Sequence, residues 1–484
     1  MAFIGLLFCV STVAGSSAQT FTKLFSFNET DGADPINSTL VQGADGNLYG
    51  TTAYAGATNA GTLFKITLGG RFTTLYNFCS QPSCTDGLEP IGGLALDTNG
   101  DLYGVTYGGG VNNGNLNSGT VFKITPTGQL TTLHKFCTQS SCTDGASPTG
   151  ALLRGADGNF YGTTTRGGTA GLGTIFKITP SGAFTLLSSF VCTETSCPGG
   201  SVPNGGLLQA IDGNLYGTSY YGGPYYWCIG GGVLFAMTPE GDLTAVHDFC
   251  EPNGFSPATG VIQATNGNLY GTTNLGGSVN EQGFGTVFEI TPAGRFYSLY
   301  TFCLQSGCPD GNYPVGLIQA TDGNLYGLTL QGPYNDGTVF EITTTGQLTT
   351  LHSFSGADGL DPYGSLFQAT NGIFYGTTTT GGDIRCSYGQ EKGCGSVFSL
   401  STGLAPFVKT VPVTGSAGAR VIILGNNLQG AIGVTFNGTA VESFSVNSSG
   451  SAVATTVPTG ATSGTVVVTT PTGTLTSNVT FRVP

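Results

Sequence analysis

The chain has 484 residues, of which 81 are glycine and only 8% are charged. Its formal net charge is −13 with 14 Lys and Arg residues, which excludes a typical nucleic-acid-binding surface because phosphate binding needs a basic one. The many Gly, Thr, Tyr, Phe and Val residues favour short strands and tight turns, so we expect an all-β protein. The chain is too long to fold around a single ordinary hydrophobic core, which indicates a repeat array with a small extra domain.

Residues 1–18 are predicted to be an export signal. Positions 2 to 15 are mostly apolar or small, and Ser16, Ser17 and Ala18 supply the small residues that signal peptidase requires. No later apolar run approaches the ~18 residues that a membrane-spanning helix needs, so we expect no transmembrane segment. The mature protein is therefore expected to be secreted or held at the cell surface.

A segment of the type Asp-Gly-Asn-Leu-Tyr-Gly recurs seven times between residues 45 and 376. Each repeat holds four β-like segments, which in the second repeat begin near Gly92, Leu102, Gly119 and Leu130. Four antiparallel strands per repeat of roughly 50 residues predict the blade of a propeller, with an open solenoid as the alternative. The tyrosines of the seven segments are Tyr49, Tyr103, Tyr161, Tyr216, Tyr270, Tyr326 and Tyr375.

The ends of the array decide between these alternatives. The last repeat lacks its fourth segment after Leu400, and residues 21–27 match the fourth segment of the first repeat at residues 72–78. The N-terminal strand can therefore complete the last repeat and close a ring, which removes exposed sheet edges. We predict a seven-bladed β-propeller over residues 19–404, closed by the N-terminal strand and followed by an immunoglobulin-like β-sandwich over residues 405–484.

The two faces of such a ring differ in loop length. Turns after the first and third strands are short, whereas connections after the second and fourth strands are long and variable, so binding loops belong on this second side, the long-loop face. All cysteines except Cys9 fall in or beside the long loops. Four Cys-x4-Cys pairs in separate repeats favour disulfides over metal sites, Cys386 could pair with Cys394, and Cys228 and Cys250 have no near neighbours. The expected disulfide cysteines are Cys79, Cys84, Cys137, Cys142, Cys192, Cys197, Cys228, Cys250, Cys303, Cys308, Cys386 and Cys394.

The histidines are the first candidates for a catalytic base or a metal ligand. His134, His247 and His352 occupy the same repeat position, on predicted outermost strands of separate blades. They cannot converge on one ion or substrate, so we expect a structural role. Asp-Gly-Asn turns, such as that at Asp212, are expected to be turns because the calcium-loop pattern with its terminal Glu is missing. We expect no metal and no cofactor.

A second acidic series stands in the pattern Asp-Gly-x-x-Pro on the long-loop face. It could ring the mouth of the channel and attract a cation, although capping of each local turn is the alternative that the residue types favour. Its members are Asp31, Asp86, Asp144, Asp310 and Asp358. Carboxylate pairs such as Asp86 with Glu89 could also cleave a glycosidic bond, but nothing in the sequence singles out one pair.

The most distinctive patch outside the repeated motifs is aromatic. It lies in a long loop of the fourth repeat, contains the only Trp of the chain, and is followed by Cys228. Aromatic planes stack on sugar rings or anchor protein partners, while packing over the loop is the structural alternative. The candidate ligand-binding residues are Tyr220, Tyr221, Tyr225, Tyr226 and Trp227.

Two resemblances follow from these motifs. The repeated Asp-Gly-Asn-Leu-Tyr-Gly-Thr-Thr, Gly-Thr-Val-Phe-Lys-Ile-Thr-Pro and Asp-Gly-x-x-Pro segments resemble the GloVer tandem repeats of exported bacterial proteins, over residues 20–404. That resemblance implies an exported surface protein and no particular reaction. The strand and turn alternation from Pro406 to Val483, with Val457-Pro458, resembles the TIG (IPT) immunoglobulin-like domain, which implies a spacer or adhesion module.

From the sequence we expect an exported, monomeric, non-catalytic binding or adhesion protein. Its partner would be a glycan or a surface protein, recognised through the long-loop face. The alternatives are a polysaccharide hydrolase or lyase that uses loop carboxylates, and a structural component of the cell envelope. A deep pocket of converging acids would favour the enzyme, and an aromatic platform would favour binding.

Overall fold

The structure, a computed structural model, describes residues 19–110, 118–139, 141–193, 196–224, 231–250, 253–257, 259–277, 283–333, 336–388 and 391–484. The predicted export signal at residues 1–18 lies outside this part of the chain. The described residues are strands, turns and one short 3-10 helix, η1 (Pro82–Cys84), so the all-β prediction is confirmed. No described helix has the length and apolar character needed to cross a membrane.

Seven antiparallel sheets follow one another along the described part of residues 20–401, and we number them as repeats 1 to 7. Repeat 1 comprises β2 (Val41–Gln42), β3 (Leu48–Thr52), β4 (Thr62–Ile66) and β5 (Phe72–Asn77). Repeat 2 comprises β6 (Ala95–Leu96), β7 (Leu102–Thr106), β8 (Thr120–Ile124) and β9 (Leu130–Lys135). Repeat 3 comprises β10 (Ala146–Pro148), β11 (Leu153–Arg154), β12 (Phe160–Arg166), β13 (Thr174–Ile178) and β14 (Phe184–Ser189).

The remaining repeats keep the same order. Repeat 4 comprises β15 (Ser196–Pro203), β16 (Leu208–Gln209), β17 (Leu215–Pro224), β18 (Val233–Met237) and β19 (Leu243–Asp248). Repeat 5 comprises β20 (Ile262–Gln263), β21 (Leu269–Thr273), β22 (Thr286–Ile290) and β23 (Phe296–Thr301). Repeat 6 comprises β24 (Asn312–Gln319), β25 (Leu325–Gln331), β26 (Thr338–Ile342) and β27 (Leu348–Ser353). Repeat 7 comprises β28 (Phe367–Gln368), β29 (Phe374–Thr378), β32 (Ser396–Ser401) and the N-terminal β1 (Thr20–Ser26); β30 (Ser387–Tyr388) and β31 (Glu391–Lys392) form a small hairpin before β32.

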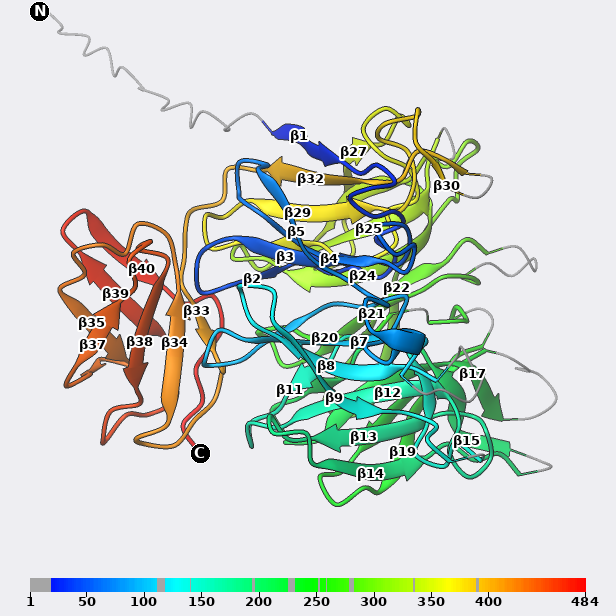
Figure 1. Ribbon diagram of the computed structural model, residues 1–484, viewed down its shortest axis with the longest axis horizontal. Helices are drawn as coiled ribbons and strands as arrows, with labels where there is room; N and C mark the ends of the chain where they lie inside the picture. The colour runs from blue at the N-terminus through cyan, green and yellow to red at the C-terminus, as the bar shows by residue number, and fades with distance from the viewer. Residues whose placement is uncertain are drawn as a thin grey trace, which may run out of the picture.

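The N-terminal strand completes repeat 7, as the sequence predicts. Strand β1 pairs antiparallel with β32 from Thr20 opposite Ser401 to Ser26 opposite Ser396. Segments of all seven repeats, each beside its first strand, line one central cavity of about 190 Å³. The sheets therefore surround a common axis in a propeller-like arrangement (Figure 1).

The repeated Tyr-Gly-Thr-Thr motif has a packing reason. A Cβ added at Gly104 would lie 2.5 Å from the Phe122 ring, so glycine is required for the Phe of the third strand to cross the second strand. The hydroxyls of Thr106 and Thr120 are 2.8 Å apart, in a fully buried hydrogen bond between the same two strands. The motif thus pins the second strand of a repeat to the third.

The C-terminal part forms two further sheets with a buried core of their own. One sheet contains β33 (Lys409–Val411), β34 (Arg420–Leu424), β38 (Ala452–Thr456) and β37 (Phe444–Val446). The other contains β36 (Thr439–Ala440), β35 (Gly433–Phe436), β39 (Val466–Thr470) and β40 (Gly473–Thr476). Side chains of both sheets, including Val421, Val453 and Val468, share one buried cluster.

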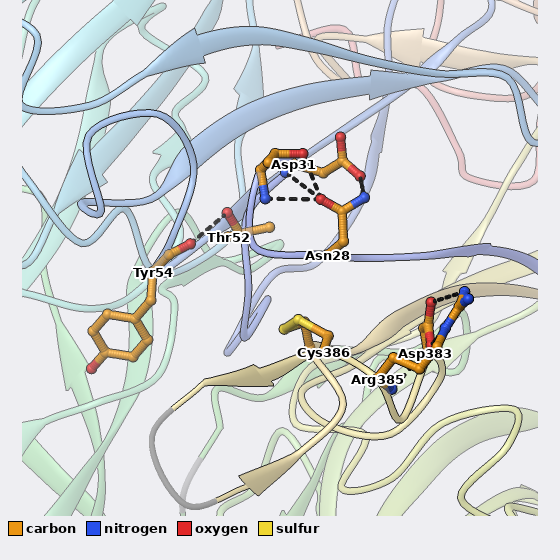
Figure 2. Close-up of a disulfide and its surroundings, with 9 residues drawn as sticks. Asn28, Asp31, Thr52, Tyr54, Asp383, Arg385 and Cys386 are labelled. Carbon is orange, nitrogen blue, oxygen red and sulfur yellow. Dashed lines mark hydrogen bonds and ion pairs between the residues drawn. A yellow bond between two sulfur atoms is a disulfide. The ribbon is translucent and has the colours of Figure 1, made fainter.

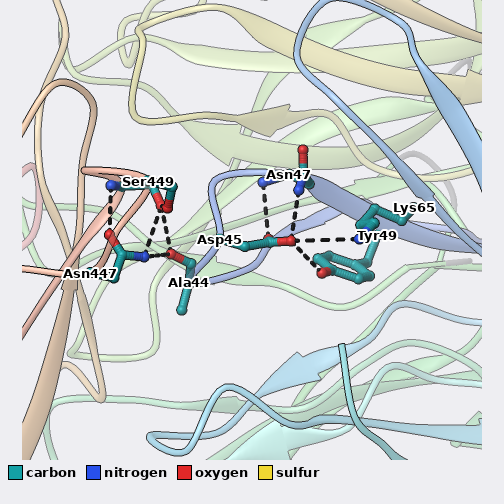
Figure 3. A network of polar contacts seen from close by, with 8 residues as sticks. Ala44, Asp45, Asn47, Tyr49, Lys65, Asn447 and Ser449 are labelled. Carbon is teal, nitrogen blue, oxygen red and sulfur yellow. Dashed lines mark hydrogen bonds and ion pairs between the residues drawn. The ribbon is translucent and has the colours of Figure 1, made fainter. Parts of the chain in front are cut away.

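The C-terminal part packs against the short turns of the repeats (Figures 1 and 3). Asn447 Nδ2 and Ser451 Oγ each donate a hydrogen bond of 2.6 Å to the carbonyl oxygen of Ala44, beside the first Asp-Gly-Asn turn. Arg420 donates to Asn99 Oδ1 of repeat 2 at 3.3 Å. Burial lowers the pKa of Arg482, and the charge of Asp212 in repeat 4 opposes that shift. The long-loop face lies on the opposite side, away from the C-terminal part (Figure 1).

Candidate ligand-binding site

The five aspartates of the Asp-Gly-x-x-Pro series are held in local hydrogen bonds. Asp86 is 2% exposed and accepts hydrogen bonds from the Tyr76 hydroxyl (2.8 Å) and the Ser80 N–H (2.9 Å). Asp144 accepts one from the Cys137 N–H at 3.0 Å and lies 3.1 Å from His134 Nε2. Asp310 and Asp358 have the corresponding partners, and Asp31 accepts from the side chain of Asn28 (Figure 2).

These bonds give the aspartates a different role from the predicted cation ring. Each carboxylate closes the loop that joins the outer strand of one repeat to the first strand of the next. Within the described ranges, no group of three or more His, Cys, Asp and Glu residues could hold a metal ion. The series therefore anchors separate turns, which is the alternative the residue types favoured.

The histidines lie between neighbouring repeats. His134 stacks on Phe184 with ring centroids 3.9 Å apart, and His247 stacks on Phe296 at 4.1 Å. His352 stacks in the same way on Phe21 of β1, at 3.6 Å. This placement agrees with the expected structural role. His247 differs from the other two because its buried Nε2 has no hydrogen-bond partner among the described residues, and burial lowers its pKa to about 4.

A ring of seven backbone positions distinguishes the long-loop face. In every repeat the residue directly before the proline of Asp-Gly-x-x-Pro, or of its counterpart, is a non-glycine residue with positive φ. We call these residues the pre-proline ring: Asp34 (φ 55), Glu89 (φ 54), Ser147 (φ 53), Val202 (φ 56), Ser256 (φ 57), Tyr313 (φ 55) and Asp361 (φ 49). A side chain in this region costs about 1–2 kcal/mol relative to glycine, yet this glycine-rich chain keeps a side chain at all seven positions.

Hydrogen bonds to the preceding repeat and within the same repeat hold this conformation. The N–H of Glu89 donates to Ala60 O of repeat 1, and its carbonyl accepts from the N–H of Tyr107, both at 2.9 Å. The N–H of Val202 donates to Leu172 O of repeat 3 at 3.0 Å. The ring residues immediately precede the segments that line the central cavity, so they surround its mouth on the long-loop face.

The ring is asymmetric in charge. Its three acidic members, Asp361, Asp34 and Glu89, belong to repeats 7, 1 and 2, which are neighbours in the closed array. Burial raises the pKa of Glu89. The other members, from repeats 3 to 6, are uncharged.

A second cavity of about 550 Å³ lies beside the ring, between repeats 2, 3 and 4; we call it the side cavity. It is lined by Tyr107, Thr149, Thr165, Arg166, Gly171, Val202 and Tyr221. Thr149 also lines the central cavity, so the two cavities adjoin. Two tyrosines, one arginine and Val202 of the pre-proline ring therefore line one cavity at this side of the mouth.

Regular strands hold two functional residues of the side cavity, Tyr221 and Arg166. Tyr221 lies on β17, a strand of 10 residues, opposite Ser201 of β15, and its side chain is 49% exposed. The disulfide between Cys192 and Cys197 lies at the start of β15. Arg166 is the exposed last residue of β12 and pairs with Ala146. Among the described residues no carboxylate lies within ion-pair distance of Arg166.

The structure describes two of the five residues of the predicted aromatic patch. Tyr220 and Tyr221 make an edge-to-face contact with ring centroids 4.8 Å apart, and Tyr221 lines the side cavity. Burial, and to a smaller extent the Tyr220 hydroxyl, raise the pKa of Tyr363 in repeat 7. The other predicted residues, Tyr225, Tyr226 and Trp227, lie outside the described residues.

The sequence analysis missed Tyr107, Arg166 and the pre-proline ring. Tyr107 and Arg166 directly follow the Gly-Thr-Thr type segment of their repeats, at positions whose residues differ from repeat to repeat. The ring members likewise vary within an otherwise repeated motif. Variation at fixed positions of a regular repeat is the signal that could have identified them.

Five disulfides with short loops join cysteines of the long-loop face, as expected from their spacing. They are Cys79–Cys84, Cys137–Cys142, Cys192–Cys197, Cys303–Cys308 and Cys386–Cys394 (the last in Figure 2). Cys250 is also disulfide-bonded, and Cys228 lies outside the described residues. Such a set of disulfides is typical of a protein outside the cytoplasm.

Sequence comparison identifies the repeats. A family model of the Gloeobacter/Verrucomicrobia repeat matches residues 4–150 and 111–308, which together are more than half of the chain. The chain belongs to this repeat family. No curated protein sequence matches this Gloeobacter/Verrucomicrobia repeat protein significantly.

Solved structures resemble the repeat protein in fold. A fungal alcohol oxidase of the AA5 family, in complex with copper, is 10% identical with a TM-score of 0.51, covering 96% of this chain and 98% of the oxidase. The periplasmic gluconolactonase of Pseudomonas aeruginosa is 16% identical with a TM-score of 0.44, covering 75% of this chain and 99% of the lactonase. At such identities the likeness concerns the fold alone.

Proposed function

We propose that this repeat protein is an exported glycan-binding protein of the cell surface or the extracellular space. Its repeats, residues 19–404, would form a seven-bladed β-propeller, and residues 405–484 an immunoglobulin-like domain of the TIG/IPT type. The glycan binds on the long-loop face, at the mouth that the pre-proline ring surrounds. The 19–404 and 405–484 boundaries follow the change of repeat motif in the sequence.

The side cavity is the observation that carries this proposal. Its volume of about 550 Å³ falls in the range of about 300–1,000 Å³ that is common for small-molecule sites. The apolar C–H face of a pyranose ring matches the exposed ring of Tyr221, and the hydroxyls of the sugar need the polar groups that surround it. A site on paired strands keeps its geometry without a ligand, which lowers the entropic cost of binding.

The position of the C-terminal part also supports this face. Within the described residues it contacts short turns on the opposite side, at Ala44 and Asn99. It therefore leaves the long-loop side of the central cavity free for a polymer. Copper chemistry like that of the AA5 oxidase is not proposed, because the three histidines pack separately between different pairs of repeats.

Retention on a panel of polysaccharides tests the proposal. Residues 19–484 are applied to each polymer beside two variants, Tyr221→Ala and the control Tyr297→Ala. Tyr297 is also exposed, at 38%, but lies on the outer strand β23, away from the cavity. We expect retention on at least one polymer, a loss of about 10-fold in affinity for Tyr221→Ala, and no change for Tyr297→Ala.

The same experiment distinguishes the alternatives when new reducing or unsaturated ends are also measured. Release of such ends by the unaltered protein would contradict a pure binding role and favour a hydrolase or lyase acting through the acidic members of the ring. Retention on none of the polymers would contradict glycan binding and favour a protein partner or a structural role. Equal losses for both tyrosine variants would show that the side cavity is not the site.

A further inference from the structure

We infer that the glycan unit in the side cavity carries a carboxylate, which Arg166 binds; this inference rests on the proposed function. The ligand class is therefore an acidic polysaccharide built of uronic acid residues. In such a sugar the carboxylate is attached to the pyranose ring itself, so one residue offers both a C–H face for Tyr221 and an anion for Arg166.

Arg166 has no carboxylate partner among the described residues, in a protein where cations are scarce. The chain has 14 Lys and Arg residues against 27 Asp and Glu residues. Several other cations of the repeats have carboxylate partners: Lys65 with Asp45, Lys123 with Asp101, and Arg154 with Asp97. Arg166 has no such partner among the described residues, and it lines a cavity. A guanidinium group presents a planar fork of donors that matches a carboxylate with two parallel hydrogen bonds.

The neighbours of Arg166 restrict what it can bind. Tyr107 and Tyr221 line the same cavity, and the nearby Thr165 hydroxyl is already committed to the carbonyl of Ser147 at 2.8 Å. The guanidinium group and the tyrosine hydroxyls therefore remain to donate hydrogen bonds to acceptor atoms of a ligand. An anion attached to a ring satisfies this set better than a neutral hexose, which would leave the charge of Arg166 unpaired.

The charge of the whole protein makes the inference testable. With a net charge of −13, the surface repels a polyanion at long range, so general electrostatic attraction cannot explain its retention. Binding of an acidic polysaccharide would have to come from a local site. Screening by salt at about 0.15 M limits the repulsion to distances under about 8 Å and leaves a close ion pair in the cavity weaker but present.

Polygalacturonate and its methyl ester provide the direct comparison, since they differ only at the carboxyl group, which is charged in the acid and carries a methyl group in the neutral ester. Affinities of residues 19–484 for both polymers, and for dextran sulfate, are measured at 0.15 M salt. The variants are Arg166→Gln, Arg166→Lys and the control Arg295→Gln. Arg295 is an exposed arginine on the outer side of repeat 5 whose guanidinium lies 5.0 Å from the Tyr297 ring, so the control removes the same charge beside a tyrosine elsewhere.

We expect polygalacturonate to bind more tightly than its ester by about 10-fold or more. Arg166→Gln should lower the affinity for polygalacturonate by the same factor. Arg166→Lys keeps the charge without the fork and should recover part of the affinity, while Arg295→Gln should bind like the unaltered protein. Thermal unfolding of each variant checks that the fold is intact.

Three results would overturn the inference. Equal binding of the acid and the ester, with Tyr221→Ala still defective, would reject the carboxylate and leave glycan binding in place. Binding of dextran sulfate as tightly as polygalacturonate, dependent on Arg166, would indicate an unselective anion site. Retention on no polymer, neutral or acidic, would reject both the inference and the proposed function.

Discussion

The side-chain oxygen of Gln42 accepts a hydrogen bond of 3.0 Å from the N–H of Thr370, although 328 residues separate the two along the chain. The same bond joins neighbours in the middle of the array, for example Gln209 to Ala156 and Gln263 to Ile211. Repeats 7 and 1 are therefore joined in the same way as repeats 3 and 4 and repeats 4 and 5. This bond and the β1–β32 pairing close the array from two different strands.

Substitution Gln42→Ala should lower the free energy of unfolding by about 1–3 kcal/mol. Gln42 is 1% exposed and Thr370 is fully buried, so the substitution leaves a buried N–H without a partner. Denaturant unfolding of residues 19–484 measures the change. The exposed turn residue Gln347 serves as the control, since Gln347→Ala should change stability by less than about 0.5 kcal/mol. Equal stability of the two variants would argue against closure through this bond.

The side chains of the pre-proline ring should contribute to ligand binding and little to the stability of the fold. Val202→Gly relieves a β-branched residue of an unfavourable positive φ, which offsets the lost side chain and the greater flexibility of glycine. We expect a change in unfolding free energy within about 1 kcal/mol, together with weaker binding of whichever polysaccharide is retained.

Gly87→Ala provides the opposite case. Its φ is +96, and an added Cβ would lie 2.3 Å from Thr106 Oγ1, so this substitution should destabilise the protein clearly. A large loss of stability in Val202→Gly, comparable to that of Gly87→Ala, would mean that the ring side chains serve the fold rather than the ligand.

The short disulfides should each stabilise the repeats modestly. Cys303 and Cys308 are separated by 5 positions, and closing so small a loop in the unfolded chain corresponds to about 2 kcal/mol. The double variant Cys303→Ser with Cys308→Ser should therefore unfold at lower denaturant concentration with an unchanged slope. Identical midpoints for the two proteins would contradict a stabilising role for this bond.

The fold and the site differed in how far the sequence could predict them. Strand order and ring closure were predictable because they follow from a repeated local pattern, in which residues 21–27 match residues 72–78. The role of Asp86 was also predictable as the favoured alternative, since its carboxylate accepts from Tyr76 and Ser80 within ten positions of the chain. The positive φ of Glu89 was not, because its N–H is bonded to Ala60 of another repeat, a contact that exists only after the repeats pack.

Protonation of His247 should weaken the protein in mild acid. Its folded-state pKa is about 4, below the ordinary value of 6.5, so between these values the unfolded chain binds more protons. The stability that depends on neutral His247 should be fully present above pH 6.5 and should decrease as the pH falls toward 4. Since the side chain is partly exposed, we expect a loss of about 1–2 kcal/mol.

Substitution His247→Phe tests this dependence. Phe25 occupies the equivalent position and stacks on Phe72 at 4.1 Å, as His247 stacks on Phe296, so the variant should pack normally. When unfolding is measured at pH 5 and pH 8, the free energy of unfolding of the variant should exceed that of the unaltered protein mainly at pH 5. An equal increase at both pH values would mean that hydrophobic burial, and not protonation, causes the effect.

Hydrogen exchange in the presence of polygalacturonate tests most directly whether the ligand binds at the mouth on the long-loop face. We predict slower exchange in peptides that contain Tyr107, Arg166 and Tyr221, and unchanged exchange in the C-terminal strands β33 to β40. Protection confined to the C-terminal strands, or no protection at any site at a saturating concentration of the polymer, would contradict the account.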